Sequence, residues 1–440
     1  MKKNIRIFYI LFGIIFINAV TYAQNNPAVL SLDEAISIAL ANNFDIQIAK
    51  NNQTIAEIEN NKGNAGLLPT ARATTGYTIG NTNIEQRLNT GTTIKRNGNI
   101  SQNENIALTG QYFLFNGFRG VAAKRRLELQ EERSMADVKN NINNTVYNVI
   151  NAYINIKRFQ QQYKATVEAM TLFEERIKLA ENKLRVGTGN KSDLLQAQID
   201  FNEQKNSLLS LESNIAQSKT TINNLLARNP ATLFTVQDTI NTVELPKIQE
   251  VIAGLDSLNP ALVIAKYDKY ILEQQNREIN ALRLPSVLLN AGTNLSNTSN
   301  TAGQMLRNFS YGPNAGVTLV IPIFQGGIIK QQLKVNSIQQ KNQDIFYKQT
   351  LVNLETTITN AYINYDYALK QFDLEKENLK LVEENNIIAM ERFKKASINT
   401  VELRQTQLNL VAAQTRMINA QFLMEQALND VLLISGSLVR

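Results

Sequence analysis

The sequence contains two copies of one pattern, and this duplication limits the possible folds more than any other feature. The pentapeptide NAYIN occurs at 151–155 and again at 360–364, an offset of 209 residues (360 − 151). The same offset relates DLLQAQ at 193–198 to ELRQTQ at 402–407. Repetition over so many residues is typical of a structural unit that a chain uses twice.

Upstream of these motifs the offset between the two copies is larger. LLPT with Pro69 matches RLPS with Pro285, an offset of 216 residues (285 − 69). The first copy therefore has seven more residues (216 − 209) between Pro69 and Phe115, which indicates an exposed loop there. We expect the following organisation: a first repeat at 24–228, an equatorial linker at 229–246 and a second repeat at 247–440.

The composition excludes several classes of catalytic site. The 440 residues include no cysteine and no histidine. Thiol nucleophiles, zinc sites built from cysteine and histidine, and Ser-His hydrolase sites are therefore excluded. A carboxylate enzyme such as a glycosidase remains open, although the chain also lacks tryptophan for stacking on sugars. We expect no enzymatic activity, no cofactor and no metal.

The first 23 residues have the features of an export signal. A basic start, MKKNIR, precedes an apolar run and the sequence TYA before Gln24, which is a small-residue cleavage site. A transmembrane anchor is the alternative, but the apolar run is short. We therefore expect 1–23 to be a cleaved signal peptide. The net charge of +7 is spread along the chain, which favours a solvated surface over nucleic-acid binding.

Seven-residue periods predict long helices that pack as coiled coils. The longest is expected from about 118 to 184, with apolar residues at Val149, Ile156, Tyr163, Met170, Ile177 and Leu184. Shorter helices are expected over about 31–66, 193–227, 247–283 and 402–435. A short helix before the strands and one after the long helix together match the length of the long helix. We expect them to meet halfway, with the linker forming a layer around the waist.

Alternating apolar and polar residues predict two β-hairpins, at 70–116 and 286–323. Segments of about ten residues with one apolar face suit a transmembrane barrel. A soluble, half-buried hairpin is the alternative, but the export signal favours the barrel. Four strands cannot close a barrel around a lumen, and an open sheet edge cannot face lipid, so the chain must oligomerise.

At this point the chain resembles the TolC-type outer-membrane factor family. The resemblance is carried by LSLDEAISIALANN, by LFNG and IFQGG at strand ends, and by the turn motifs KLRVGTGNKSDLLQAQ and RFKKASINTVELRQTQ. It implies a mainly α-helical, internally duplicated chain with a membrane β portion. In a homotrimer, a 12-stranded β-barrel would continue into a 12-helix periplasmic coiled-coil tube.

The resemblance also implies a function and partners. Such proteins form the outer-membrane exit duct of tripartite efflux or type I secretion systems, with a long periplasmic extension. The expected partners are a periplasmic adaptor protein, an inner-membrane pump or ABC transporter, and outer-membrane lipid. A secreted structural coiled-coil protein without membrane insertion is the alternative, although it leaves the alternating segments unexplained.

In this family, acidic residues on the last helix surround the closed periplasmic entrance. Carried over by alignment, the first such position is Glu402, and the second is Gln405, which departs from the acidic pattern. Glu402 could equally be a residue favoured by the positive start of a helix. In the first repeat the corresponding residues are Asp193 and Gln196, where helix capping is the stronger interpretation.

The stretch VGTGNKSD at 186–193 contains glycines and a Lys-Ser pair, as a phosphate-binding loop does. However, Asn190 separates Gly189 from Lys191, and the second copy of the stretch lacks both glycines. We therefore predict a helix reversal in which Ser192 or Asp193 caps the next helix. The candidate adaptor-docking residues at the two turns are Gly187, Thr188, Gly189, Asn190, Lys191, Lys395, Ala396, Ser397, Ile398 and Asn399.

Overall fold

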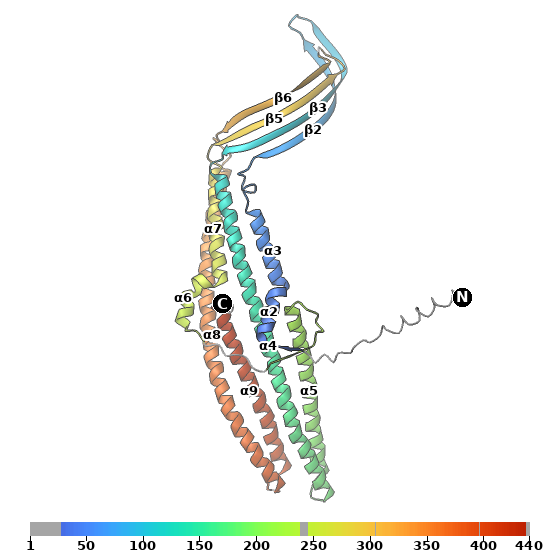
Figure 1. Ribbon diagram of the computed structural model, residues 1–440, viewed down its shortest axis with the longest axis vertical. Coiled ribbons are helices and arrows are strands. Elements are labelled where there is room, and N and C mark those ends of the chain that lie inside the picture. Colours follow the sequence, from blue (N-terminus) through green and yellow to red (C-terminus); the bar gives the residue numbers. More distant parts are fainter. Residues whose placement is uncertain (1–27, 238–244, 304, 396, 437–440) are drawn as a thin grey trace, which may run out of the picture. The chain divides into compact units, whose positions relative to one another are not determined.

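The computed structural model describes residues 28–237, 245–303, 305–395 and 397–436. The predicted signal peptide, part of the linker and Ala396 lie outside these residues. The described chain is mostly helical, as predicted (Figure 1). The elements are β1 (Ala28–Leu30), α2 (Leu32–Asn42), α3 (Phe44–Glu59), β2 (Thr70–Arg87), β3 (Thr93–Phe115), α4 (Arg119–Arg185), α5 (Lys191–Leu225), β4 (Phe234–Val236), α6 (Ile248–Leu258), α7 (Pro260–Ala281), β5 (Ser286–Asn300), β6 (Arg307–Val320), α8 (Ile328–Lys394) and α9 (Thr400–Ile434).

The chain folds into two compact units, and each unit contains parts of both repeats. Unit 1 contains α2, α5, most of α9 and the second halves of α4 and α8. Unit 2 contains α3, α6, α7, the four long strands and the first halves of α4 and α8. The helices α4 and α8 are each 67 residues long. At ~1.5 Å per residue each extends over about 100 Å, too long for a compact domain core.

Unit 1 has an apolar core where the short parallel pair of β1 and β4 packs on α4. Tyr153, from the first NAYIN motif, is fully buried in this core. Its hydroxyl donates to the carbonyl of Leu30 (3.0 Å) and accepts from the backbone N–H of Gln237 (3.0 Å). One tyrosine thus ties both strands to α4, and satisfies its own buried hydroxyl in doing so.

Each helix that was predicted to precede a hairpin is broken in two by an asparagine. The first divides at Asn43 and the second at Asn259, positions that match under the offset of 216 residues. The Asn43 side-chain amide donates to the carbonyl of Leu225 (2.9 Å), and that of Asn259 donates to the carbonyl of Ile434 (3.0 Å). Each asparagine therefore supplies a donor to the carbonyl end of a later helix, where carbonyls lack intrahelical partners.

These contacts confirm that the two short helices of each repeat meet, but the prediction of one unbroken helix over 31–66 was wrong. The apolar period continues across Asn43 without a glycine or proline, so the sequence period alone does not reveal the break. The first helical segment also ends at Glu59, earlier than predicted, and is followed by a turn before β2.

In unit 2, four antiparallel strands form one sheet in the order β2-β3-β5-β6 (Figure 1). The pairing between β3 and β5 joins the hairpins of the two repeats. The first hairpin extends beyond the second, since β2 and β3 contain 18 and 23 residues and β5 and β6 contain 15 and 14. The extra residues of the first repeat therefore lie in a longer hairpin.

The strand register gives the sheet one apolar face. Leu108 pairs with Thr293, Ile106 with Leu295, and Leu289 with Val317. Because paired residues project to the same side, the apolar residues of all four strands form one surface. Its large exposed members are Tyr77, Ile79, Ile106, Leu108, Tyr112, Leu289, Phe309, Tyr311, Val317 and Leu319. The opposite face carries mainly amide, hydroxyl and glycine residues.

One helical stretch in the described chain, Ile248–Ala281, is long and apolar enough by composition to cross a membrane. It comprises α6 and α7, which the break at Asn259 separates into helices of 11 and 22 residues. A third of its most apolar window is buried in the protein. The stretch therefore has the character of two packed helices.

Candidate functional site at the helix turns

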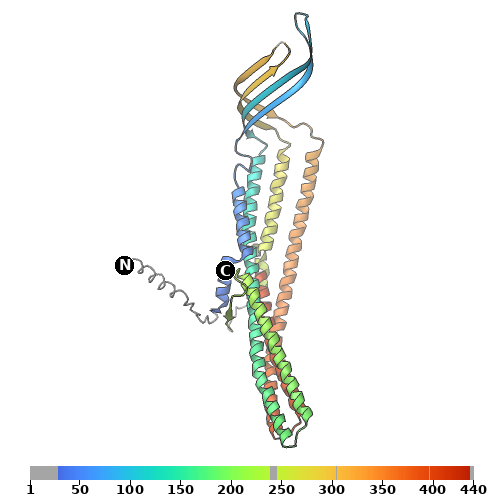
Figure 2. The ribbon, with the colours of Figure 1, turned by 90° about the vertical axis from the view of Figure 1, so that its right-hand side faces the viewer.

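The first predicted turn joins α4 to α5, which lie side by side (Figure 2). Gly187 has φ +76°, a left-handed conformation that suits glycine at the end of a helix. Gly189 approaches Lys183 and Leu184 so closely that a Cβ would lie 2.8 Å from their backbone atoms. The turn therefore requires both glycines for its geometry, and the loop follows a helix, whereas a phosphate loop follows a strand.

Capping of the next helix differs from the prediction. Helix α5 begins at Lys191, and the side chain of Asn190 accepts from the N–H of Ser192 (2.9 Å). Asn190 is thus the cap, and the assignment of Ser192 or Asp193 was wrong by two or three residues. Asn399 has the same role before α9, where its side chain accepts from the N–H of Glu402 (2.8 Å).

The two turns contact each other within unit 1. The hydroxyl of Thr400 donates to the carboxylate of Asp193 (3.3 Å). The ammonium group of Lys183 lies 3.6 Å from the ring centre of Phe393, a cation–π contact between the ends of α4 and α8. The first and second repeats therefore meet at their turns.

Most of the predicted docking residues at these turns are exposed, but Ile398 is not. Its side chain packs in a small core with Met390, Phe393 and Leu403. An adaptor protein could therefore reach the exposed turn residues but not Ile398. The exposed residues are Gly187, Thr188, Asn190, Lys191, Lys395, Ser397 and Asn399.

The candidate constriction residues are also distributed unevenly. Glu402 is half exposed and forms an ion pair with Arg392 at 3.5 Å. Gln405 is exposed and donates to Asn409 (2.9 Å). Gln196 instead points inward and donates to the carboxylate of Asp200 (2.9 Å). The pairing of Glu402 with Arg392 offsets part of the negative charge that was expected there.

A charged cluster that was not predicted lies near the turns. Asp200 on α5 is fully buried and forms ion pairs with Arg176 on α4 and Arg404 on α9. Arg404 binds both carboxylate oxygens, at 2.7 and 3.0 Å, and this two-point geometry is among the stronger ionic contacts. Arg176 also donates to the side chain of Gln407 (3.0 Å). One carboxylate thus connects three helices.

The partners of Asp200 keep it ionised despite its burial. Burial opposes the charge, but hydrogen bonds from Arg404 and Gln196 and the charge of Arg176 lower the pKa of its carboxyl below the ordinary value. Burial lowers the pKa of Arg176, against the attraction of Asp200. The hydrogen bond to Asp200 raises the pKa of Arg404. Loss of either charge would leave another one buried without compensation.

A comparison of the two repeats contains the signal for this cluster. With the offset of 209 residues, Arg176 corresponds to Asn385 and Asp200 to Asn409. Charges that one copy has and the other lacks belong to the place where the copies differ. Among the described residues, no group of three or more acidic side chains could hold a metal ion.

The chain matches the family model "Outer membrane efflux protein" over residues 35–228 and 257–437. The chain belongs to the outer membrane efflux protein family. It is 22% identical over 413 residues to the probable efflux pump outer membrane protein TtgC of Pseudomonas putida, covering 88% of this chain and 79% of that protein. It is 20% identical over 308 residues to the outer membrane efflux protein BepC of Brucella suis, covering 70% of this chain and 66% of BepC, just under two thirds.

Solved structures of outer membrane channels share the fold. The Campylobacter jejuni channel CmeC superposes with a TM-score of 0.78 at 17% identity, covering 92% of this chain and 85% of that one. The Vibrio cholerae protein VceC gives 0.75 at 16% identity, covering 92% and 96%. The outer membrane efflux protein studied here is therefore an outer-membrane protein with a TolC-like fold, in a family of channels and not of enzymes.

Proposed function

We propose that this protein is the outer-membrane exit duct of a tripartite efflux or type I secretion system. Three copies would close a 12-stranded barrel that continues into a 12-helix periplasmic tube. Substrates would pass through passively, because an inner-membrane pump supplies the energy. The observation that carries the proposal is the strand register, which gathers the apolar side chains of both hairpins on one face of an open sheet.

The sheet supports closure by other copies of the chain. Its outer strands, β2 and β6, each have one edge without a strand partner in the chain. Unpaired backbone groups are too costly to leave in the hydrocarbon core of a membrane. Pairing of β6 with β2 of the next copy would satisfy both edges, and three copies of four strands make a barrel of adequate size.

The helices support the same assembly. Helix α8 exposes apolar residues every seven positions: Ile338, Ile345 and Val352 in unit 2, and Tyr367, Leu374 and Leu381 in unit 1. Such a stripe is the seam of a coiled coil that lacks its partner helix. Ile48 and Ile55 on α3 are exposed with the same spacing. We assign these stripes to contacts with neighbouring copies of the chain.

The turns would form the periplasmic tip, where an adaptor protein docks and the entrance narrows. In that position three copies of Glu402 would approach the channel axis and attract cations. The ion pair with Arg392 and the capping by Asn399 support the alternative, in which Glu402 stabilises the start of α9. Asp193 and Gln196 have structural partners, which favours Glu402 over them as a pore residue.

The proposal is tested by isolating the protein from the outer membrane. We expect an SDS-resistant, heat-modifiable trimer in the outer-membrane fraction. A soluble monomer in the periplasm or medium would instead support the secreted coiled-coil protein.

The role of Glu402 is tested by replacing it with alanine in the purified trimer. At the constriction, Glu402→Ala should raise single-channel conductance or weaken block by multivalent cations, because a ring of negative charge is lost. Asp366→Ala, which breaks an exposed ion pair with Lys370 elsewhere on unit 1, is the control. Conductance and block equal to those of the wild type would assign Glu402 to helix capping alone.

A further inference from the structure

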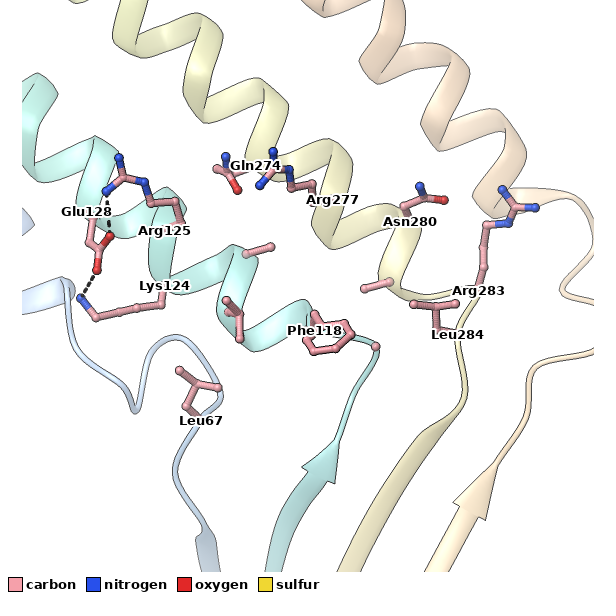
Figure 3. A pocket seen from close by; sticks show the side chains of 14 residues that line it. Leu67, Phe118, Lys124, Arg125, Glu128, Gln274, Arg277, Asn280, Arg283 and Leu284 are labelled. Carbon is pink, nitrogen blue, oxygen red and sulfur yellow. Dashed lines mark hydrogen bonds and ion pairs between the residues drawn. The ribbon is translucent and has the colours of Figure 1, made fainter.

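Unit 2 contains a cavity of about 1030 Å³ where the helices meet the strands (Figure 3). It lies between the start of α4 and the end of α7, next to the segment that contains Leu67. The last residue of β3, Phe115, and the first of β5, Ser286, are only a few residues from its lining. The cavity is therefore at the level where the apolar band of the sheet ends.

The lining is strongly basic. Lys124, Arg125, Arg277 and Arg283 line the cavity, against one acidic residue, Glu128. Glu128 pairs with Lys124 (3.2 Å) and Arg125 (2.9 Å). Arg277 and Arg283 are exposed and, among the described residues, have no ion pair that would neutralise them. Two guanidinium groups are thus available to an anion.

A buried acceptor also lacks a partner in the cavity. The side chain of Gln274 is only 7% exposed, and its Oε1 accepts no hydrogen bond from the described residues. Figure 3 shows its amide between α4 and α7, close to Arg277. A buried carbonyl oxygen without a donor costs about 1–3 kcal/mol, so a ligand with a hydroxyl or ammonium donor would relieve a real penalty.

The mouth of the cavity is apolar. Phe118, Val121 and Leu284 are exposed by 66%, 58% and 45%. Phe118 has φ +65°, a left-handed conformation that is rare for an aromatic residue. The preceding Gly117 approaches the carbonyl of Ala281 so closely that a Cβ would lie 2.7 Å from it. This tight connection holds an aromatic ring outward at the rim of a basic cavity.

The cavity opens on the side of α7 that contacts α6. Gln274 and Arg277 follow Lys266 and Tyr270 at helical spacing, so all four lie along one side of α7. Lys266 forms an ion pair with Asp256 of α6 (2.6 Å). In the proposed tube α6 belongs to the outer layer around the waist, so the cavity faces the surroundings of the tube and not its lumen.

We propose that this cavity binds a phospholipid of the periplasmic leaflet, with an anionic headgroup that carries a hydroxyl donor. The phosphate would lie between Arg277 and Arg283, and a headgroup hydroxyl would donate to Gln274 Oε1. The acyl chains would leave past Phe118 and Leu284 toward the apolar face of the sheet. Basic pockets beside a membrane recognise anionic lipids by this combination of charge and position. The inference rests on the proposed insertion of the sheet in the membrane.

The test is native mass spectrometry of the detergent-purified trimer, titrated with phosphatidylglycerol or with phosphatidylcholine. We expect phosphatidylglycerol to be retained preferentially. The double variant Arg277→Gln, Arg283→Gln should bind it about tenfold more weakly. Gln274→Leu should reduce the preference for phosphatidylglycerol over phosphatidic acid, which lacks the hydroxyl. Arg119→Gln, which lines a different cavity between α7 and α8, should bind like the wild type.

Equal binding of the two lipids by the wild type, or undiminished binding by the double variant, would overturn the proposal. Glycerol phosphate in solution distinguishes a lipid site from a site for free phosphate esters, and displacement of the lipid at equal concentration would also overturn it. Both exchanged arginines are exposed, and the trimer mass in the same spectrum reports assembly directly. A trimer that conducts ions but shows no lipid preference would contradict this inference and leave the exit-duct function intact.

Discussion

At the residue scale, Asp200 is the most constrained charge in the described chain. It is fully buried, it is shared by Arg176 and Arg404, and it connects α4, α5 and α9. The heptad pattern identified the helices around it but not the residue, because a seven-residue period reports apolar positions. A buried ion pair depends on which helices become neighbours, and this information is absent from any single helix.

Replacing Asp200 with asparagine should loosen the turn region. The neutral amide leaves Arg176 buried without a counter-charge, which costs about 3 kcal/mol or more. The free energy of local opening of 172–207, measured by hydrogen exchange, should fall by that order. Glu391→Gln is the control, because its exposed pair with Lys394 should contribute less than about 1 kcal/mol. Equal protection in D200N and wild type would show that the cluster does not stabilise the turns.

Acid should act on the same cluster. The folded-state pKa of Asp200 is lower than its ordinary value of about 4. Its contribution is therefore fully present above that ordinary value and is lost as the pH falls through the lower, folded-state pKa. Hydrogen-exchange protection of 172–207, corrected for the intrinsic exchange rate, should fall below about pH 4 in the wild type.

Asp430 should respond to acid in the opposite direction. Burial raises the pKa of its carboxyl, although the hydrogen bond from Tyr147 acts against this. Mild acid therefore relieves a buried charge near Asp430 before it weakens the Asp200 cluster. The variant D200N should lack the transition below pH 4, and an unchanged transition in that variant would assign it to another group.

At the element scale, the sequence predicted the kinds of element and their order, because their periods are strong. Alternation marked the strands and heptads marked the long helices. The breaks at Asn43 and Asn259 were missed, because in the first repeat the helical pattern continues across the break. Pro260, which suits the first turn of a helix, was the available signal in the second repeat. The equivalence of Asn43 and Asn259 then transfers the signal to the first repeat.

Asn259→Ala should destabilise unit 2 at the junction of α7 and α9. The substitution removes the donor to the carbonyl of Ile434 and the cap on the N–H of Ala261 (3.0 Å). The expected loss is about 1–3 kcal/mol, measured as the free energy of opening of the α7 amides. Asn259→Asp keeps the capping oxygen and should fall in between. Asn353→Ala, at an exposed position within α8, should have little effect, and an equal loss there would contradict the role of Asn259.

At the scale of the whole molecule, the features of the single chain that lack an internal explanation agree with one another. The sheet has two open edges and one apolar face, and α8 exposes an apolar stripe at heptad spacing. A trimer that spans the outer membrane explains all three, whereas a secreted coiled coil explains only the stripe. Copy number and closure could not follow from sequence periods, because those periods describe one chain.

The central claim is that the assembled protein is a conducting duct, and single-channel recording tests it most directly. Trimer purified from the outer membrane should insert into planar lipid bilayers and give stepwise ionic conductance. The heat-dissociated monomer, added at the same protein concentration, should give none. A trimer that inserts into the bilayer without any conductance, or a conductance that the dissociated monomer reproduces, would contradict the account.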